Sequence, residues 1–266
     1  MGSLRPSAIA LLLLVPASAF AQEPEVEAEK RVYSRYERET IDAALARMKA
    51  RPDDAPEGKL IESVDVEPLE VVEPRDPIPD VLALPRILNF IHSTSRSRVI
   101  RQEVLQRPGA RYRQALIDET CRNLRTQPQL SLVLCFPVEG SAPDRVRVVV
   151  VTKDVWSLRL GWDLRYANGK LEHLLIAPTE SNVAGTHQAI TATIELNPAT
   201  YSLGAQYAVP RIAGSWIQAN TFANVIVNRS TGGAEGSFGG FTYGQPLYST
   251  QAKWGWDGTI QWRKDV

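Results

Sequence analysis

The sequence is poor in the residues that build metal sites and catalytic centres. It has 2 Cys and 3 His in 266 residues. The histidines, His92, His173 and His187, stand far apart, and no Cys or His has the clustered spacing of zinc ligands. No glycine loop ends in the Gly-Lys-Ser/Thr of a phosphate site. We therefore expect a protein that is not an enzyme and that needs no metal and no cofactor.

An excess of charge and a long apolar segment are also missing. The formal net charge is zero, which argues against a nucleic-acid partner, since nucleic-acid binders are usually basic. The first residues place Arg5 before an apolar run at 9–15 and end in Ala19-Phe20-Ala21, the layout of a secretory signal peptide. The run is too short for a transmembrane helix, which needs roughly 20 residues. Residues 1–21 therefore predict an exported chain that begins at Gln22 after cleavage.

The segment 22–58 is acidic and contains one predicted helix. Residues 22–80 hold 17 acidic against 9 basic side chains. Ser34 and Glu37 have the spacing of a capping box, and an amphipathic stripe follows at Ile41, Ala44, Leu45 and Met48. Arg51-Pro52 ends the pattern. A single helix of this size must dock against another element.

Residues 59–154 predict an α+β domain in the order strand, helix, helix, strand, strand. The strands are expected at 60–66, 130–136 and 146–151, because these short runs are apolar or alternate with acids and are bounded by Gly and Pro. The helices are expected at 97–106 and 113–126. Ile61 is out of phase with Val64 and Val66 in the first strand.

Two cysteines of this domain point toward one core. Cys121 shares a helix face with Ile117 and Leu124, and Cys135 is in phase with Val133. An exported chain meets an oxidising compartment, which permits a disulfide; two buried thiols are the alternative. A bond would close a loop of about 15 residues and contribute ~3 kcal/mol in the chain-entropy model.

Strict alternation of apolar and polar residues begins at Trp156. Its even positions are large and apolar up to Tyr166, and Asn168-Gly169 is a strong hairpin signal. The pattern returns at 190–196, 201–209 and 254–262. Residues 155–266 therefore predict about seven strands of roughly ten residues, which is typical of an outer-membrane β-barrel. A soluble β-sandwich also alternates, but charged residues opposite large aromatics in an exported chain favour the barrel.

Several motifs resemble those of a known family. Residues 61–153 resemble a POTRA domain, with Gly109, Tyr112, Leu116 and Leu124 at its Gly-x-x-aromatic turn and second helix. Residues 180–185, 207–214 and 245–248 resemble the strand-start and Tyr-x-x-Pro-Arg-x-x-Gly motifs of the bacterial surface antigen superfamily, which includes BamA, TamA and the two-partner-secretion transporters. Two features depart from the family: only one POTRA module is evident, and the Arg-Gly-Phe-type motif of the lumen loop is missing.

The resemblance implies a fold and a location. We expect an α+β POTRA domain (β-α-α-β-β) followed by antiparallel transmembrane β-barrel strands, placed in the cell outer membrane with the N-terminal domain in the periplasm. The family's barrels have about sixteen strands, so seven cannot close a circle. We therefore expect an N-terminal fragment of a longer protein.

The resemblance also implies a function that involves no catalysed reaction. We expect a protein that assists the insertion, assembly or translocation of β-rich or unfolded client polypeptides, with outer-membrane lipid and periplasmic accessory subunits as further partners. The alternatives are a two-partner-secretion-type transporter and a non-transporting surface antigen or interaction module.

Two surfaces of the resembled domain are candidate binding sites. The strand at 130–136 would lie at a sheet edge, where a client strand adds by β-augmentation; its candidate residues are Leu130, Leu132, Leu134 and Phe136. The alternative is an edge that is blunted or covered. The arginines at 96, 98, 101, 107, 111 and 113 would meet acidic headgroups, acidic clients or the Glu-rich segment, or form a solvated face.

Overall fold

The computed structural model describes residues 33–73 and 93–265. The predicted signal peptide, residues 22–32 and His92 lie outside the described residues. The described chain forms two compact units: residues 33–73 and 93–156 with 184–186 make the N-terminal unit, and residues 157–183 with 187–265 make the C-terminal unit. No helix in the described residues is long and apolar enough to cross a membrane.

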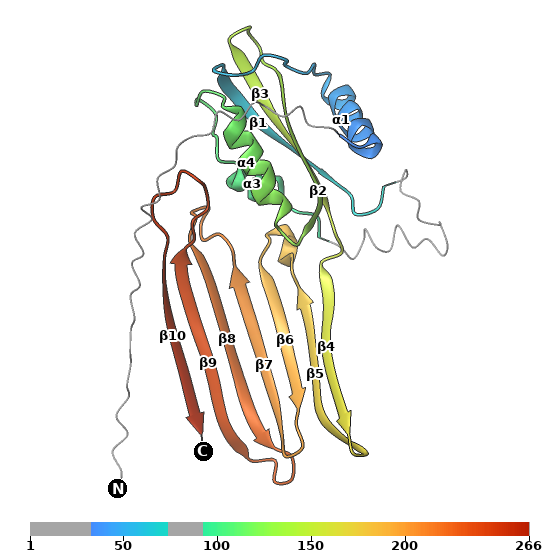
Figure 1. The fold of residues 1–266 in the computed structure, drawn as a ribbon, viewed down its shortest axis with the longest axis vertical. Coiled ribbons are helices and arrows are strands. Elements are labelled where there is room, and N and C mark those ends of the chain that lie inside the picture. Colours follow the sequence, from blue (N-terminus) through green and yellow to red (C-terminus); the bar gives the residue numbers. More distant parts are fainter. Residues whose placement is uncertain (1–32, 74–92, 266) are drawn as a thin grey trace. The chain divides into compact units, whose positions relative to one another are not determined.

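The N-terminal unit contains the predicted order of elements and a three-stranded sheet (Figure 1). Its elements are α1 (Arg35–Met48), β1 (Leu60–Leu69), α3 (Ser97–Glu103), α4 (Gln114–Arg125), β2 (Leu130–Glu139) and β3 (Arg145–Asp154). The sheet order is β1-β3-β2, with β1 parallel and β2 antiparallel to β3. β3 is central because its run of valines is buried on both faces of the sheet.

A β-bulge explains the phase of the first strand. The register of β1 on β3 shifts between Ile61 and Ser63. One extra residue reverses the alternation, so Ile61 and Val64 lie in the same core although they are an odd number of positions apart in the sequence.

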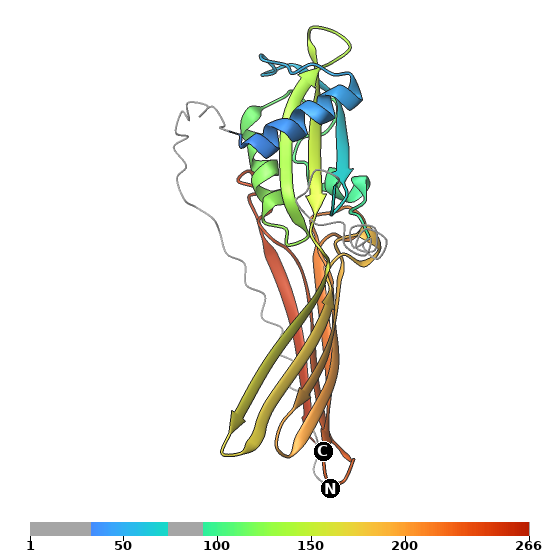
Figure 2. The same ribbon diagram turned by 90° about the vertical axis from the view of Figure 1, so that its right-hand side faces the viewer.

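Helices cover both faces of this sheet, so the unit has two cores (Figures 1 and 2). The core under α3 and α4 contains Ile61, Val64, Ile100, Val104, Tyr112, Ile117, Cys121, Leu124, Leu130, Val133, Cys135, Val146, Val148 and Val150. The core under α1 contains Ala44, Leu69, Leu134, Phe136, Val138, Val149 and Val151. The predicted amphipathic helix thus docks on the sheet face that the other two helices leave open.

Local contacts fix α1 on the sheet. Ser34 and Glu37 form the capping box, with N–H to side-chain distances of 2.7 and 3.2 Å. Near its start, the Lys153 ammonium of β3 donates to the Tyr36 hydroxyl (2.9 Å). Near its end, Arg47 pairs with Glu67 of β1 (2.5 Å). The apolar stripe and these polar contacts together define how α1 lies across the sheet.

The C-terminal unit is one antiparallel sheet of seven consecutive strands (Figure 1). They are β4 (Leu158–Ala167), β5 (Lys170–Glu180), β6 (Ala189–Leu196), β7 (Thr200–Val209), β8 (Gln218–Asn228), β9 (Ala234–Gln245) and β10 (Trp256–Asp265). The short helix η1 (Val183–Gly185) follows β5, and its last two residues belong to the N-terminal unit. The prediction of about seven strands is confirmed. β4 and β10 end the order and do not pair with each other, so the sheet is not closed.

One face of this sheet is mainly apolar, and the other is mixed. Trp162 pairs with Ile176, and Leu203 pairs with both Ile194 and Val225, so apolar side chains continue from strand to strand. Exposed apolar side chains of the strands are Leu158, Leu160, Trp162, Leu164, Tyr166, Ile190, Ile194, Leu203, Tyr207, Val225, Phe241, Trp256, Ile260 and Trp262. The opposite face carries charged and amide side chains such as Asp163, Glu195 and Gln206, and it also includes the apolar residues Leu175, Phe222, Ile226 and Phe238.

Candidate functional site

The edge of β2 is the first candidate binding site, and its backbone hydrogen bonds show which groups point away from the sheet. Asp53 N–H donates to Pro137 O (3.3 Å), and Glu139 N–H donates to Arg51 O (2.9 Å). Backbone direction alternates with a period of two along a strand. Val133 and Cys135 therefore share the outward direction of Pro137, whereas Leu132, Leu134 and Phe136 do not. The register shift between Leu130 and Leu132 separates Leu130 from this alternation.

Most of this edge is blunted. The Arg125 guanidinium donates to Val133 O (2.9 Å), Pro137 has no N–H to offer, and Arg51–Asp53 pairs with the far end of the strand. The Val133 N–H and both backbone groups of Cys135 have no hydrogen-bond partner in the described part of the chain. This stretch, which we call the open window because its backbone groups lack hydrogen-bond partners, is about two residues long, and both of its residues are only 2% exposed.

The side chains of the predicted edge residues serve the two cores. Leu130 lies under α3 and α4, whereas Leu134 and Phe136 are buried under α1, with Leu132 partly buried beside them. Sequence reasoning missed the outward-facing residues because apolar side chains do not reveal the direction of backbone groups. Pro137 was the one sequence signal that a neighbouring strand stops there.

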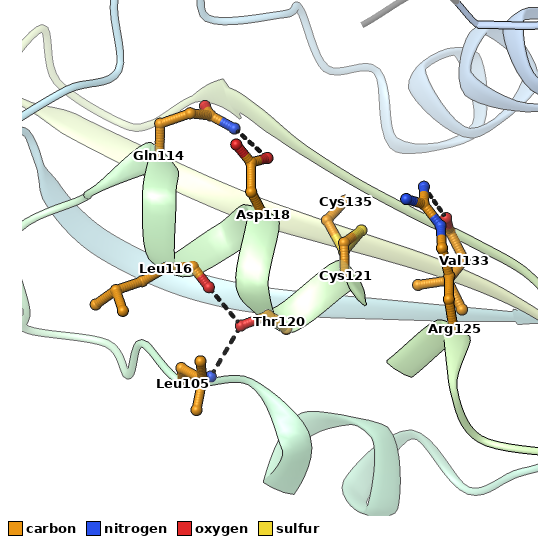
Figure 3. The surroundings of a disulfide bond; sticks show 9 residues. All are labelled: Leu105, Gln114, Leu116, Asp118, Thr120, Cys121, Arg125, Val133 and Cys135. Carbon is orange, nitrogen blue, oxygen red and sulfur yellow. Dashed lines mark hydrogen bonds between the residues drawn. A yellow bond between two sulfur atoms is a disulfide. The ribbon is translucent and has the colours of Figure 1, made fainter. Parts of the chain in front are cut away.

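A disulfide fixes the open window to α4 (Figure 3). Cys121 and Cys135 are bonded, with Cα atoms 6.1 Å apart, and both side chains are buried. In α4, Thr120 immediately precedes Cys121. Its hydroxyl donates to Leu116 O (2.8 Å) and accepts from Leu105 N–H (3.1 Å). The centre of β2 is thus tied to a helix whose own position is fixed.

The outer edge of β1 is blunted by the same means. Gly109 N–H donates to Ile61 O (2.8 Å), and Tyr112 N–H donates to Lys59 O (2.8 Å). Gly109 has φ +88°, which glycine adopts readily. Further along, Arg101 donates to Val64 O (3.1 Å). The Gly-x-x-aromatic turn of the resemblance is therefore the segment that covers the start of this edge.

One acidic residue fixes the turn between β2 and β3. Ser141 N–H donates to the Glu62 carboxylate (2.8 Å). This hydrogen bond lowers the pKa of Glu62 below its usual value of 4.5. A lowered pKa stabilises the folded state above pH 4.5, and that contribution is lost as the pH falls through the lower value.

In the C-terminal unit, two motifs from the resemblance meet. The Arg211 guanidinium lies 3.9 Å from the centre of the Trp216 ring, and Trp216 stacks on Tyr248 at 4.2 Å. Arg211 belongs to the turn after β7 and Tyr248 to the turn after β9. A stacked column therefore joins two turns that are not neighbours in the chain.

The turn after β5 is organised by the asparagine of the Asn-x-x-Gly motif. Asn182, which is 1% exposed, accepts the N–H of His187 on its side-chain oxygen (2.9 Å). Val183 N–H donates to Gln188 O (2.9 Å). His187 is thus part of this turn.

The histidine on the polar face of the strands lies among carboxylates. His173 Nε2 lies 3.7 Å from Asp163, and its Nδ1 lies 3.7 Å from Glu195 and 3.2 Å from the Asn197 side-chain oxygen. Across residues 33–73 and 93–265, no group of three His, Cys, Asp or Glu side chains could hold a metal ion. His173 lies in β5 and His187 in the turn that follows this strand, so the two described histidines do not form a cluster.

Comparison with known proteins supports the fold alone. The chain matches BamA from Haemophilus ducreyi lacking POTRA domains 1–3 with a TM-score of 0.51 and 11% identity, over 82% of this chain and 43% of that chain. CdiB from Acinetobacter baumannii matches with a TM-score of 0.35 and 8% identity, over 78% of this chain and 39% of that one; this likeness is too weak to carry an argument. No family model matches the sequence, and no curated protein matches it.

The BamA match shows a similar fold, in which the seven-stranded sheet matches part of a barrel. In this chain the sheet is not closed, because its terminal strands are unpaired with each other. The chain spans less than half the length of either matched structure.

Proposed function

We propose that the chain is part of an outer-membrane protein that helps insert or translocate β-rich or unfolded client polypeptides. The two-faced, seven-stranded meander that follows a small α+β unit carries this proposal. Its N-terminal unit, in this proposal a POTRA domain in the periplasm, would receive clients. Its strands would form the first part of a transmembrane barrel, and no chemical step is needed.

The exposure of the apolar face supports a membrane location. Trp162 is 69% exposed and Ile260 68% exposed, and the described residues of this unit provide no second layer that covers the face. A soluble sandwich would bury such a face against another sheet. Strands of 8 to 12 residues suit a tilted membrane crossing, which takes about 9–11 residues. Lipid is therefore the natural cover.

The open window on β2 supports client binding through backbone hydrogen bonds. Groups at Val133 and Cys135 face outward on an otherwise blunted edge. Main-chain pairing accepts clients of varied sequence, which fits a protein with many substrates.

Fractionation of the gene product that contains this chain tests the proposal. We expect the mature protein in the outer membrane, with faster migration on a gel before boiling than after it. A soluble periplasmic protein without this shift would refute the membrane location. Depletion should lower many barrel proteins at once; the loss of one exported product would indicate a secretion transporter instead.

Photo-crosslinking tests the client window. A photoreactive residue at Ser131, exposed on β2, should crosslink nascent barrel proteins. The same residue at Ser141, exposed on the following turn, should not. Equal crosslinking at both positions would refute the assignment of the β2 edge as the client-binding site.

A further inference from the structure

The helical layer of the N-terminal unit has a strongly positive surface. Residues 96–125 contain eight arginines and no lysine. We call these the arginine surface: Arg96, Arg98, Arg101, Arg107, Arg111, Arg113, Arg122 and Arg125. The three acids of this segment do not balance them, because Glu103 and Glu119 are buried and Asp118 accepts from Gln114 (2.9 Å).

Several of these arginines support the fold. Arg101, Arg111 and Arg125 donate to backbone carbonyls of the sheet edges or their flanks. Arg98 and Arg122 are exposed and make no hydrogen bond or ion pair through their side chains to any other described residue. Their charges are therefore not needed for the packing of the unit.

Arg98 and Arg122 lie at the same end of the unit. Ser95 N–H, just before α3, donates to the Asp154 carboxylate at the end of β3 (2.6 Å). α4 ends shortly before Leu130, which pairs with Asp154. The first turn of α3 and the last turn of α4 therefore both lie beside the point where the chain leaves β3.

Two other arginines lie at the opposite end. Arg113 precedes Gln114, whose N–H donates to the Glu57 carboxylate ahead of β1 (2.9 Å). Arg107 precedes the Gly109 turn, which covers the start of the same strand. These two side chains also make no ion pair among the described residues, so they form a matched pair for comparison.

This inference rests on the proposed function, in which the strands from β4 onward cross a membrane. The length of the connecting chain then keeps the end with Arg98 and Arg122 close to that membrane. Four residue steps separate Asp154 from Leu158, which begins β4. An extended chain spans at most about 3.6 Å per residue, so Asp154 stays within roughly 14 Å of the first apolar strand residue, whatever angle the two units adopt.

We propose that Arg98 and Arg122, together with Arg96, bind the phosphates of anionic phospholipid headgroups. Guanidinium groups match phosphate oxygens with two parallel hydrogen bonds, and they are more weakly hydrated than ammonium groups. This contact would hold the N-terminal unit against the bilayer and so fix the direction in which the β2 edge faces.

Energy transfer in vesicles tests this surface. The gene product receives one added thiol by Gln102→Cys, on an exposed position of α3; both cysteines of this chain are in the disulfide. A donor dye on this thiol and acceptor dyes on headgroups report contact. We expect transfer to rise from pure phosphatidylcholine to 7:3 phosphatidylcholine:phosphatidylglycerol and to fall at high salt.

Two double variants locate the contact. Arg98→Gln with Arg122→Gln should raise the phosphatidylglycerol fraction at half-maximal transfer, with an affinity loss of roughly five-fold per arginine. Arg107→Gln with Arg113→Gln removes the same charge at the other end and should change the affinity by less than about two-fold. Equal losses would mean a net-charge effect and would overturn the assignment.

Other outcomes identify another ligand or another failure. If inorganic phosphate at constant ionic strength abolished the energy transfer, the ligand of these arginines would be free phosphate and not a lipid headgroup. Competition by polyglutamate, with no response to vesicles, would mean an acidic polypeptide partner. Gel migration of the same vesicle samples before and after boiling separates the two proposals. Faster migration before boiling, with energy transfer that does not depend on phosphatidylglycerol, would refute only the headgroup contact. No difference in migration would refute the proposed membrane function.

Discussion

Reduction of the disulfide should destabilise the N-terminal unit by a predictable amount. The sequence separation of 14 between Cys121 and Cys135 closes a loop of about 15 residues. In the chain-entropy model such a loop contributes ~3 kcal/mol at 25 °C. With a urea dependence of about 2 kcal/mol per molar, the unfolding midpoint of the unit should fall by roughly 1.5 M.

Hydrogen exchange in a urea series measures this midpoint. Peptides from α4 and β2 report the unit separately from the seven-stranded sheet. Because both cysteines are buried, the bond is reduced in denaturant and the chain is then refolded. The Cys121→Ala, Cys135→Ala variant is the control and should not respond to reductant. A shift below about 0.3 M would refute the reasoning, since it would mean that the unfolded chain loses little entropy on closing this loop.

Two substitutions test packing in each unit. Gly239→Ala places a methyl group into the Trp262 ring of β10 and should destabilise the sheet by about 1–3 kcal/mol through overpacking. The gel band of the unboiled protein should then disappear at a lower temperature. Gly258→Ala, which meets open space, should leave that temperature unchanged. Ala44→Asp puts a charge under α1, where Ala44 is fully buried, and should cost about 3 kcal/mol or more, seen as faster trypsin cleavage within α1, while Ala46→Asp on the exposed face should not change the cleavage rate.

The sequence was most informative where one rule applied to a whole element. Alternation along 156–166 predicted β4 because successive side chains of a strand point to opposite faces of its sheet. The capping box at Ser34 predicted the start of α1 for an equally local reason. Such patterns need no knowledge of distant partners.

Contacts between distant segments could not be predicted in the same way. The bulge beside Ile61 and the pairing of Arg51–Asp53 with β2 depend on backbone register, which side-chain types do not encode. The stack of Arg211, Trp216 and Tyr248 joins residues 37 positions apart. The sequence therefore proposed β2 as a candidate edge, but the direction of its backbone groups was found only from the structure.

The short window on β2 sets an upper limit on how long a client strand can stay there. Three backbone groups are open, and each hydrogen bond contributes about 1 kcal/mol net. A total of ~3 kcal/mol corresponds to a dissociation constant weaker than about 1 mM. Capture at this edge would then be a brief contact that succeeds only at high local client concentration, and release would need no energy source. In the proposed function, an edge of this kind would pass clients on instead of storing them.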